Sequence, residues 1–378
     1  MSDYDFVARI AGGVGEFEEA DWDRCAGAAN PFTSHAFLSI LEESGSVTAR
    51  TGWQPVPVAI DGRDGRPAAV MPAYVKNHSQ GEYVFDHGWA DAYERAGGVY
   101  YPKLQIAVPF TPVPGRRLLV RDAALAPALI RAAEAMVERH GLSSAHATFI
   151  APEEVETFER AGWLIRIDSQ FHWHNRGYGG FDDFLASLSS RKRKAIRKER
   201  AASLEGLEVR HLVGPGIAEA HWDAFWAFYQ DTGSRKWGRP YLTRAFFSLL
   251  GERIPEQVLL VLAMRGDVPV AGALNLIGGD ALYGRYWGTL VEAPHLHFEI
   301  CYYQAIEFAI ANGLARVEAG AQGAHKLSRG YEPVPTFSAH FLADPRLREA
   351  VARYLESERE AVAREIDGLA AFTPFRKG

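Results

Sequence analysis

Residues 318–340 read EAGAQGAHKLSRGYEPVPTFSAH and combine small residues with a Lys, an Arg, two His and a Gln. We expect a short strand over 315–318 to lead into this stretch and a strand over 336–342 to leave it. The stretch contains three glycines, which suit a chain that turns or lets another group approach its backbone. A packed core does not need this mixture, so the stretch is interpreted as a functional site.

Two halves of the chain show the same order of predicted elements. In the first half we expect strands over 53–60, 67–75 and 82–85, a helix over 129–140 and a strand over 145–150. In the second half we expect strands over 258–264, 268–276 and 281–287, a helix over 297–312 and the strand over 315–318. This repeated order predicts mixed α/β sheets in two tandem units.

The expected domains are 1–165 and 166–345, followed by an amphipathic helix over 346–378. The second domain includes a predicted basic helix over 181–206. A long insertion over 86–111 is rich in Trp, Tyr, Asp and Pro, and we interpret it as a functional loop.

Composition places the chain among globular proteins. It has 378 residues, 47% hydrophobic and 23% charged, and a formal net charge of -6. Cys25 and Cys301 lie far apart in sequence, which favours a reducing compartment rather than a disulfide framework. No signal peptide or membrane span is predicted, so we expect a cytoplasmic protein.

The run RKRKAIRKER at 191–200 holds seven cations and a single acid. Such clustering in an acidic chain favours an anionic partner with phosphates, such as tRNA, a nucleotide-linked lipid or another polyphosphate. A solvated helix face paired with acids elsewhere is the alternative. The predicted donor phosphate-binding residues are Arg191, Lys192, Lys194, Arg197 and Lys198, with Arg235 and Lys236 from a second basic cluster.

Motifs of several other chemistries are missing from the sequence. His172 with His174, and His295 with His297, are spaced so that each pair could share a strand face, but no further ligand scaffold accompanies them. We therefore expect no metal. The sequence also lacks a G-x-S-x-G, a Walker A and a G-x-G-x-x-G motif.

Several long motifs resemble one family. They are residues 318–340, NPFTSHAFLSILEESG at 30–45, ADAYERAGGVYYPKLQIAVPFTPV at 90–113, SSRKRKAIRKER at 189–200, NLIGGDALYGRYWG at 275–288 and HFEICYYQAIEFAI at 297–310. Together they resemble the bacterial FemAB-like predicted N-acyltransferases over nearly the whole chain. That family is similar to the FemABX peptidoglycan aminoacyltransferases, so the resemblance implies two tandem GNAT-like acyltransferase domains with an interdomain cleft.

The resemblance implies transfer of an acyl or aminoacyl group to the amine of a small molecule or cell-wall precursor. The donor stays open between aminoacyl-tRNA and acyl-CoA, and no bound cofactor is expected. The sequences before the helices lack the usual GNAT loop that binds the CoA pyrophosphate. The alternatives are a CoA-dependent N-acetyltransferase with a non-standard phosphate loop, and a non-catalytic relative that binds tRNA or phospholipid.

The predicted site has three parts. Lys326 is the expected anion or oxyanion contact beside Gln322, and His325 or His297 is the candidate base. Arg285, Tyr286, Trp287, Arg329 and Tyr331 are expected to bind substrate. From the first domain, Trp89, Asp91, Tyr93 and Lys103 are expected to close over the acceptor.

Overall fold

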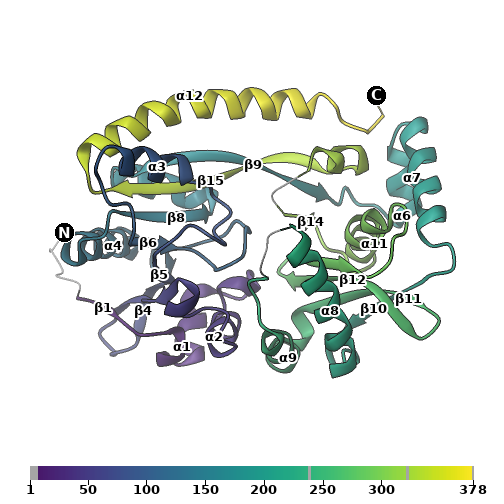
Figure 1. The fold of residues 1–378 in the computed structure, drawn as a ribbon, viewed down its shortest axis with the longest axis horizontal. Coiled ribbons are helices and arrows are strands. Elements are labelled where there is room, and N and C mark those ends of the chain that lie inside the picture. Colours follow the sequence, from purple (N-terminus) through teal and green to yellow (C-terminus); the bar gives the residue numbers. More distant parts are fainter. Residues whose placement is uncertain (1–6, 237–239, 321–322, 377–378) are drawn as a thin grey trace. The chain divides into compact units, whose positions relative to one another are not determined.

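The computed structural model describes residues 7–236, 240–320 and 323–376, which form two compact units (Figure 1). Unit 1 comprises the residues up to 168 together with 335–364, and unit 2 comprises 169–334 together with 365 onward. The sequence-based boundary at 345 therefore differs from the structural one at 334. The difference arises because strand β15 (Glu332–Leu342) hydrogen bonds to β8 (Ser144–Ile150) of unit 1 over residues 337–342.

Unit 1 contains two sheets. One has the order β1-β3-β4-β7, and in the other β15, β8, β6, β5 and β2 are neighbours. The remaining strands are β1 (Ala8–Ile10), β2 (Trp53–Pro55), β3 (Val58–Asp61), β4 (Pro67–Met71), β5 (Ala73–Lys76), β6 (Lys103–Ile106) and β7 (Leu119–Val120). β6 and β8 run parallel, which makes the second sheet mixed.

Unit 1 also contains several helices. They are α1 (Glu19–Ala26), α2 (His35–Glu43), α3 (His87–Arg95), α4 (Ala126–His140), α5 (Val155–Arg160) and most of α12 (Pro345–Ala370). An apolar stripe of α4 that includes Leu129, Ala133 and Val137 is buried in one cluster with strands of both sheets. Gly141 ends α4 in the left-handed conformation, as glycine does without strain.

Four predictions for unit 1 were wrong. The strand expected over 53–60 divides into β2 and β3, and the strand expected over 67–75 divides into β4 and β5, with one member of each pair in each sheet. Residues 82–85 form no strand, because the chain turns at Tyr83 with φ 61° and aims two carboxylates, those of Glu82 and Asp86, at Lys103. The stretch 86–111 is not one loop, since it contains α3 and the buried strand β6.

Unit 2 is built on a sheet in the order β10-β11-β12-β13-β14-β9. Its strands are β9 (Leu164–His174, which begins in unit 1), β10 (Glu208–Val213), β11 (Val258–Arg265), β12 (Val268–Gly278), β13 (Ala281–Thr289) and β14 (Arg316–Glu318). Strands β10 to β13 pair antiparallel, whereas β13 and β14 run parallel. The mixed α/β class expected for both halves is confirmed.

Helices pack on both faces of this sheet (Figure 1). They are α6 (Phe181–Ser187), α7 (Ser190–Ser203), α8 (Glu219–Lys236), α9 (Arg244–Arg253), α10 (Leu296–Phe298) and α11 (Gln304–Ala311). On one face α8 lies so close to β13 that a Cβ at Gly288 would be 2.1 Å from the carbonyl oxygen of Phe228. On the other face α11 buries Ala305 and Ile306 against the strands.

Two predicted helices of unit 2 are interrupted. The helix expected over 181–206 divides into α6 and α7, because Leu188 adopts an extended conformation and pairs with Phe375. The helix expected over 297–312 contains a π-helical turn, Glu299–Tyr303, between α10 and α11. Such turns insert one extra residue into a helix and are frequent at functional sites.

Candidate active site

The site in unit 2 lies where β13 and β14 separate. Their ladder joins Ala281 to Arg316 and ends, in the described residues, at Tyr283 and Glu318. β13 continues along β12 to Thr289, and its register with β12 shifts so that Arg285 is an extra, bulged residue. Beyond Tyr283, the edge of β13 that faced β14 therefore borders a pocket.

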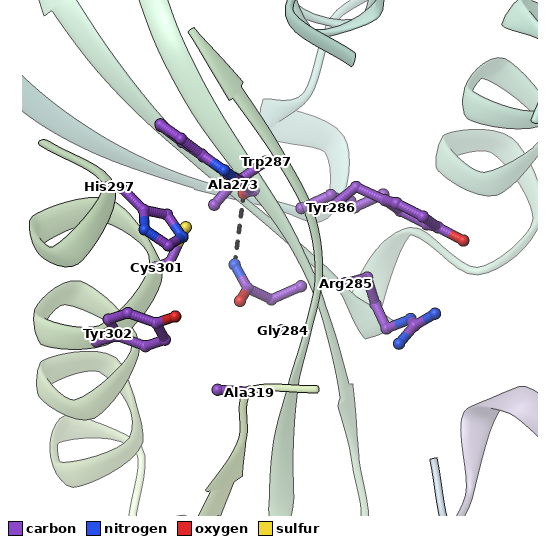
Figure 2. A pocket seen from close by; sticks show the side chains of 11 residues that line it. Ala273, Gly284, Arg285, Tyr286, Trp287, His297, Cys301, Tyr302 and Ala319 are labelled. Carbon is purple, nitrogen blue, oxygen red and sulfur yellow. Dashed lines mark hydrogen bonds between the residues drawn. The ribbon is translucent and has the colours of Figure 1, made fainter. Parts of the chain in front are cut away.

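Figure 2 shows this pocket between β13, the helix that follows it and the end of β14. It is lined by Ala273, Leu274, Asn275, Gly284, Arg285, Tyr286, Trp287, His297, Cys301, Tyr302 and Ala319. Its volume is about 110 Å³, whereas sites that enclose a drug-sized ligand have roughly 300–1,000 Å³. The pocket therefore suits a small acyl or side-chain group rather than a whole nucleotide donor.

Aromatic and imidazole rings form the helical wall of the pocket. The ring of His297 lies 4.5 Å from Trp287 and 5.3 Å from Tyr302, measured between centroids. His297, Cys301 and Tyr302 point from this wall toward β13 (Figure 2). The π-helical turn carries Cys301 and Tyr302, so the irregular helix determines which side chains reach the pocket.

His325 extends this wall from the segment after β14. Its Nε2 atom shares a hydrogen bond of 3.0 Å with the hydroxyl of Tyr302. Burial, followed by the nearby charges of Arg329 and Lys326, lowers the pKa of His325 below its usual value. Burial also raises the pKa of Tyr302, so at neutral pH the pair consists of a neutral imidazole and a phenol.

Lys326 lies behind the pocket wall and is 1% exposed. Its ammonium group donates hydrogen bonds to the carbonyl oxygens of Ala319 at 2.7 Å and Gly320 at 2.8 Å. Burial lowers the pKa of Lys326 to about 8. Because Ala319 lines the pocket, Lys326 fixes the chain where it leaves β14.

The other predicted substrate residues of unit 2 fall into two groups. Trp287 faces the helical wall, whereas Figure 2 shows Arg285 and Tyr286 directed to the opposite side of β13. The ring of Tyr286 there lies 5.3 Å from that of Tyr229 on α8. Their shared direction follows from the bulge at Arg285, which interrupts the alternation of side chains.

Arg329 and Tyr331 are buried beside the helical wall and do not line the pocket. Arg329 lies 3.4 Å above the ring of Phe298 and donates to the carbonyl oxygen of His325 at 2.8 Å. The ring of Tyr331 lies 5.5 Å from that of Tyr302. Both residues thus support the residues that line the pocket.

The four predicted acceptor residues all belong to unit 1. Asp91 is exposed, and the hydroxyl of Tyr93 donates to Asp344 at 3.3 Å. Trp89 is 7% exposed and packs edge-on against His340 with 4.9 Å between ring centroids.

Lys103 has no exposed surface, and its ammonium group donates to Ser79 and Glu82, both at 2.7 Å, and to Asp86 at 2.5 Å. An ammonium group has three protons, so the expectation that Lys103 contacts an acceptor does not fit this arrangement.

The predicted phosphate-binding residues lie mainly on α7. Arg191, Lys194, Arg197 and Lys198 are exposed, and Lys192 is half-buried. Arg197 pairs with the exposed Asp182 at 3.1 Å. Gln322 and the side chains of Arg235 and Lys236 lie outside the described part of the chain.

Among the described residues, no group of three or more His, Cys, Asp or Glu side chains is arranged to hold a metal ion. His172 instead lies near Glu318, with 3.7 Å between its Nε2 atom and the carboxylate. Within the same described range, no helix combines the length and apolar character needed to cross a membrane.

The sequence-based prediction missed Asn275, Cys301 and Tyr302 in the pocket. Cys301 and Tyr302 fall within the helix expected over 297–312, and no sequence signal marks a π-helical turn. It also missed a buried polar network in unit 1, made of Lys76, Glu82, Asp86, His146 and His340. Single charged or imidazole groups inside otherwise apolar strands, as in AYVK and SAHATFI, could have indicated it.

Two mixed α/β units have a tandem GNAT-like fold, and unit 2 has a small pocket beside its bulged strand β13. The chain belongs to the FemAB-like family, whose description is peptidoglycan biosynthesis/recognition and whose model matches residues 13–377.

Solved structures with the same fold include FemX, at 13% sequence identity and a TM-score of 0.55, covering 90% of this chain and 98% of that one. L-PGS from Bacillus licheniformis has 11% identity and a TM-score of 0.50, covering 87% and 98%. The C-terminal domain of a putative lysylphosphatidylglycerol synthetase from Agrobacterium fabrum has 10% identity and a TM-score of 0.55, covering 89% and 96%. No curated protein sequence matches the chain.

Proposed function

We propose that unit 2 transfers an acyl or aminoacyl group from an activated ester or thioester to the amine of a small molecule or cell-wall precursor. The observation that carries this proposal is the pocket of about 110 Å³ at the point where β13 leaves β14. The pocket would hold the acyl group, and backbone N–H groups on the edge of β13 that borders the pocket would donate to its carbonyl oxygen. Preorganised donors of this kind stabilise the oxyanion of acyl transfer.

His325 is the proposed base. An attacking amine must lose a proton, and a neutral imidazole accepts one at neutral pH. The lowered pKa of His325 keeps its imidazole neutral there, and its hydrogen bond to Tyr302 orients the ring toward the helical wall. Lys326 would act by holding the carbonyl groups of Ala319 and Gly320, and so the shape of the pocket.

The proposed donor is an aminoacyl-tRNA, whose phosphates would bind the exposed cations of α7. Arg and Lys make charge-assisted hydrogen bonds to phosphate, and four such side chains share the outer face of this helix. FemX and L-PGS share the fold at 13% and 11% identity, so they support the choice of chemistry and leave the donor to experiment.

Mass spectrometry of the acceptor would test the reaction. The protein is incubated with a cell-wall precursor fraction and with either charged tRNA or acetyl-CoA. We expect acceptor molecules to gain an aminoacyl mass with charged tRNA, and Lys326→Ala and His325→Ala to lower the rate at least tenfold. Glu205→Gln, an exposed change outside the site, serves as the control.

Gain of an acetyl mass with acetyl-CoA alone would replace the proposed donor by acyl-CoA. A protein that binds tRNA or phospholipid but transfers nothing from either donor would contradict the enzymatic proposal.

A further inference from the structure

Helix α7 has two faces with different partners. Arg191, Lys194, Arg197 and Lys198 are exposed on one face, while Ile196 is buried on the other. Glu199 and Arg200 flank the buried face and reach two separate segments of the candidate active site. The helix that carries the unit's densest positive charge is therefore also joined to the walls of the pocket.

Arg200 holds the π-helical turn. Its guanidinium donates to both oxygens of Glu299 at 2.9–3.1 Å and to Glu307 at 2.8 Å. The side chain of Glu299 is fully buried, and it also accepts from Gln304 at 2.6 Å. Since Glu299 begins the turn that presents Cys301 and Tyr302, the bidentate pair fixes the register of the helical wall.

Glu199 holds the segment that follows β14. Its Oε2 atom accepts from Arg329 at 2.9 Å and from the hydroxyl of Tyr303. Arg329 in turn donates to the carbonyl oxygen of His325. A single carboxylate on α7 thus joins the helical wall to the 3-10 segment Ala324–Arg329, which carries His325 and Lys326.

The same helix has features that oppose its stability in the absence of an anion. Arg191 and Lys194 are three residues apart and Lys194 and Lys198 four, so like charges are neighbours on the helix surface. The first turn has no acidic residue, and Ser189 makes no capping hydrogen bond with its side chain. Cations near a helix N-terminus are unfavourable, and bound phosphates would relieve both effects.

We propose that Glu199 and Arg200 are positioning residues, through which RNA phosphates bound to the outer face of α7 order the two wall segments of the pocket. This inference rests on the proposed function for the identity of the RNA partner. The ordering of the wall segments by a bound polyanion does not require acyl transfer. A polyanion stabilises α7, and the inner contacts of α7 then stabilise residues 299–303 and 324–329.

Amide hydrogen exchange, with and without uncharged tRNA, tests the proposal without any reaction. We expect tRNA to slow exchange at least threefold in α7 and in the segments 299–303 and 324–329. The variant R191Q/K194Q/R197Q/K198Q should bind tRNA at least tenfold more weakly. The slope of log K against log salt should decrease by about three, because each phosphate contact contributes roughly 0.7–0.9.

Glu199→Gln separates binding from positioning, with Glu205→Gln as a control that makes the same change just beyond α7. We expect Glu199→Gln to bind tRNA within about twofold of the native protein and to lose the slowed exchange in 324–329. In the transfer assay it should lower kcat more than it raises KM. If Glu199→Gln does not fold, Arg200→Lys replaces it, because Lys cannot make the bidentate pair with Glu299.

Unchanged exchange in both wall segments on tRNA binding would overturn the proposal, as would native affinity in the variant with four substitutions. Binding of α7 to vesicles of anionic lipid but not to tRNA would assign the surface to a membrane and overturn the RNA partner. If tRNA orders the pocket while no donor supports transfer, the proposed function fails and the positioning role stands.

Discussion

Lys326 contacts the chain rather than the pocket, and this contact defines what it can do. Its ammonium group is bound by the carbonyl oxygens of Ala319 and Gly320, and burial lowers its pKa to about 8. Burying this ammonium group costs free energy, and two charge-assisted hydrogen bonds at the end of β14 oppose that cost.

Lys326→Met tests whether those bonds exceed that cost. The substitution keeps most of the volume but leaves two carbonyl groups without their donor, so we expect the free energy of unfolding to fall by about 1–3 kcal/mol. Urea denaturation at pH 7 measures it, with the exposed Lys198→Met as control. Equal stability of the two variants would show that the bonds only offset the burial of charge.

Lys76 provides a prediction about pH. Its side chain is fully buried 3.6 Å above the ring of Trp53, and burial lowers its pKa to about 7. Between pH 7 and 10.5 the unfolded chain therefore binds more protons at this residue than the folded protein does. Stability due to Lys76 should rise with pH across this window.

Urea denaturation at pH 7, 8, 9 and 10 measures that rise. We expect Lys76→Met to be more stable than the native protein at pH 7 and to show a smaller rise than it does. A rise of equal size in both proteins would mean that Lys76 keeps its ordinary pKa, held by Glu82 at 3.9 Å.

At the scale of elements, Gly288 and Gly284 of β13 offer a matched pair of substitutions that test the packing of α8 on this strand. A Cβ at Gly288 would lie 2.1 Å from the carbonyl oxygen of Phe228, whereas at Gly284 its nearest neighbours would be 3.6 Å away. We expect Gly288→Ala to lower the free energy of unfolding by about 1–3 kcal/mol, because overpacking shifts the helix.

Gly284→Ala should keep the stability but reduce transfer, because Gly284 lines the pocket and the added methyl group occupies part of it. Thermal unfolding and the transfer assay together distinguish the two effects. Native stability of Gly288→Ala would contradict the observed packing of α8, and loss of stability in Gly284→Ala would contradict the space observed beside Gly284.

At the scale of the whole molecule, the end of the chain stabilises the start of α7. The amide of Ser189 donates to the carbonyl oxygen of Pro374 at 2.9 Å, and Arg176 lies 4.2 Å above the ring of Phe375. Phe375 packs on the core of unit 2, whereas Phe372 is 75% exposed.

We expect Phe375→Ala to lower the free energy of unfolding by about 2 kcal/mol, roughly half the cost for a fully buried Phe, and to speed amide exchange at 187–191. Phe372→Ala, three residues earlier, should change neither quantity. If the two variants behave alike, the tail does not contribute to the stability of α7.

Elements were predicted correctly where the sequence pattern that specifies them lies within the element itself. The helix expected over 129–140 corresponds to α4, which begins at Ala126 and ends at His140 as predicted, because its apolar spacing and Gly141 are local signals. The division of the expected helix 181–206 depends on Leu188 pairing with Phe375, far along the chain, and no local pattern contains that pair. For the same reason the sequence marks Lys326 as a candidate residue but does not show that its ammonium group binds the carbonyl oxygens of Ala319 and Gly320.

The sequence by itself determined the α/β class and the family and marked the stretch 318–340, because periodicity, turn residues and long motifs are properties of neighbouring residues. Only the tertiary structure decided which groups of that stretch face the pocket. The separation of β13 from β14, the bulge at Arg285 and the π-helical turn each depend on contacts between distant segments. These contacts place Lys326 behind the wall and join the basic helix to it through Glu199 and Arg200.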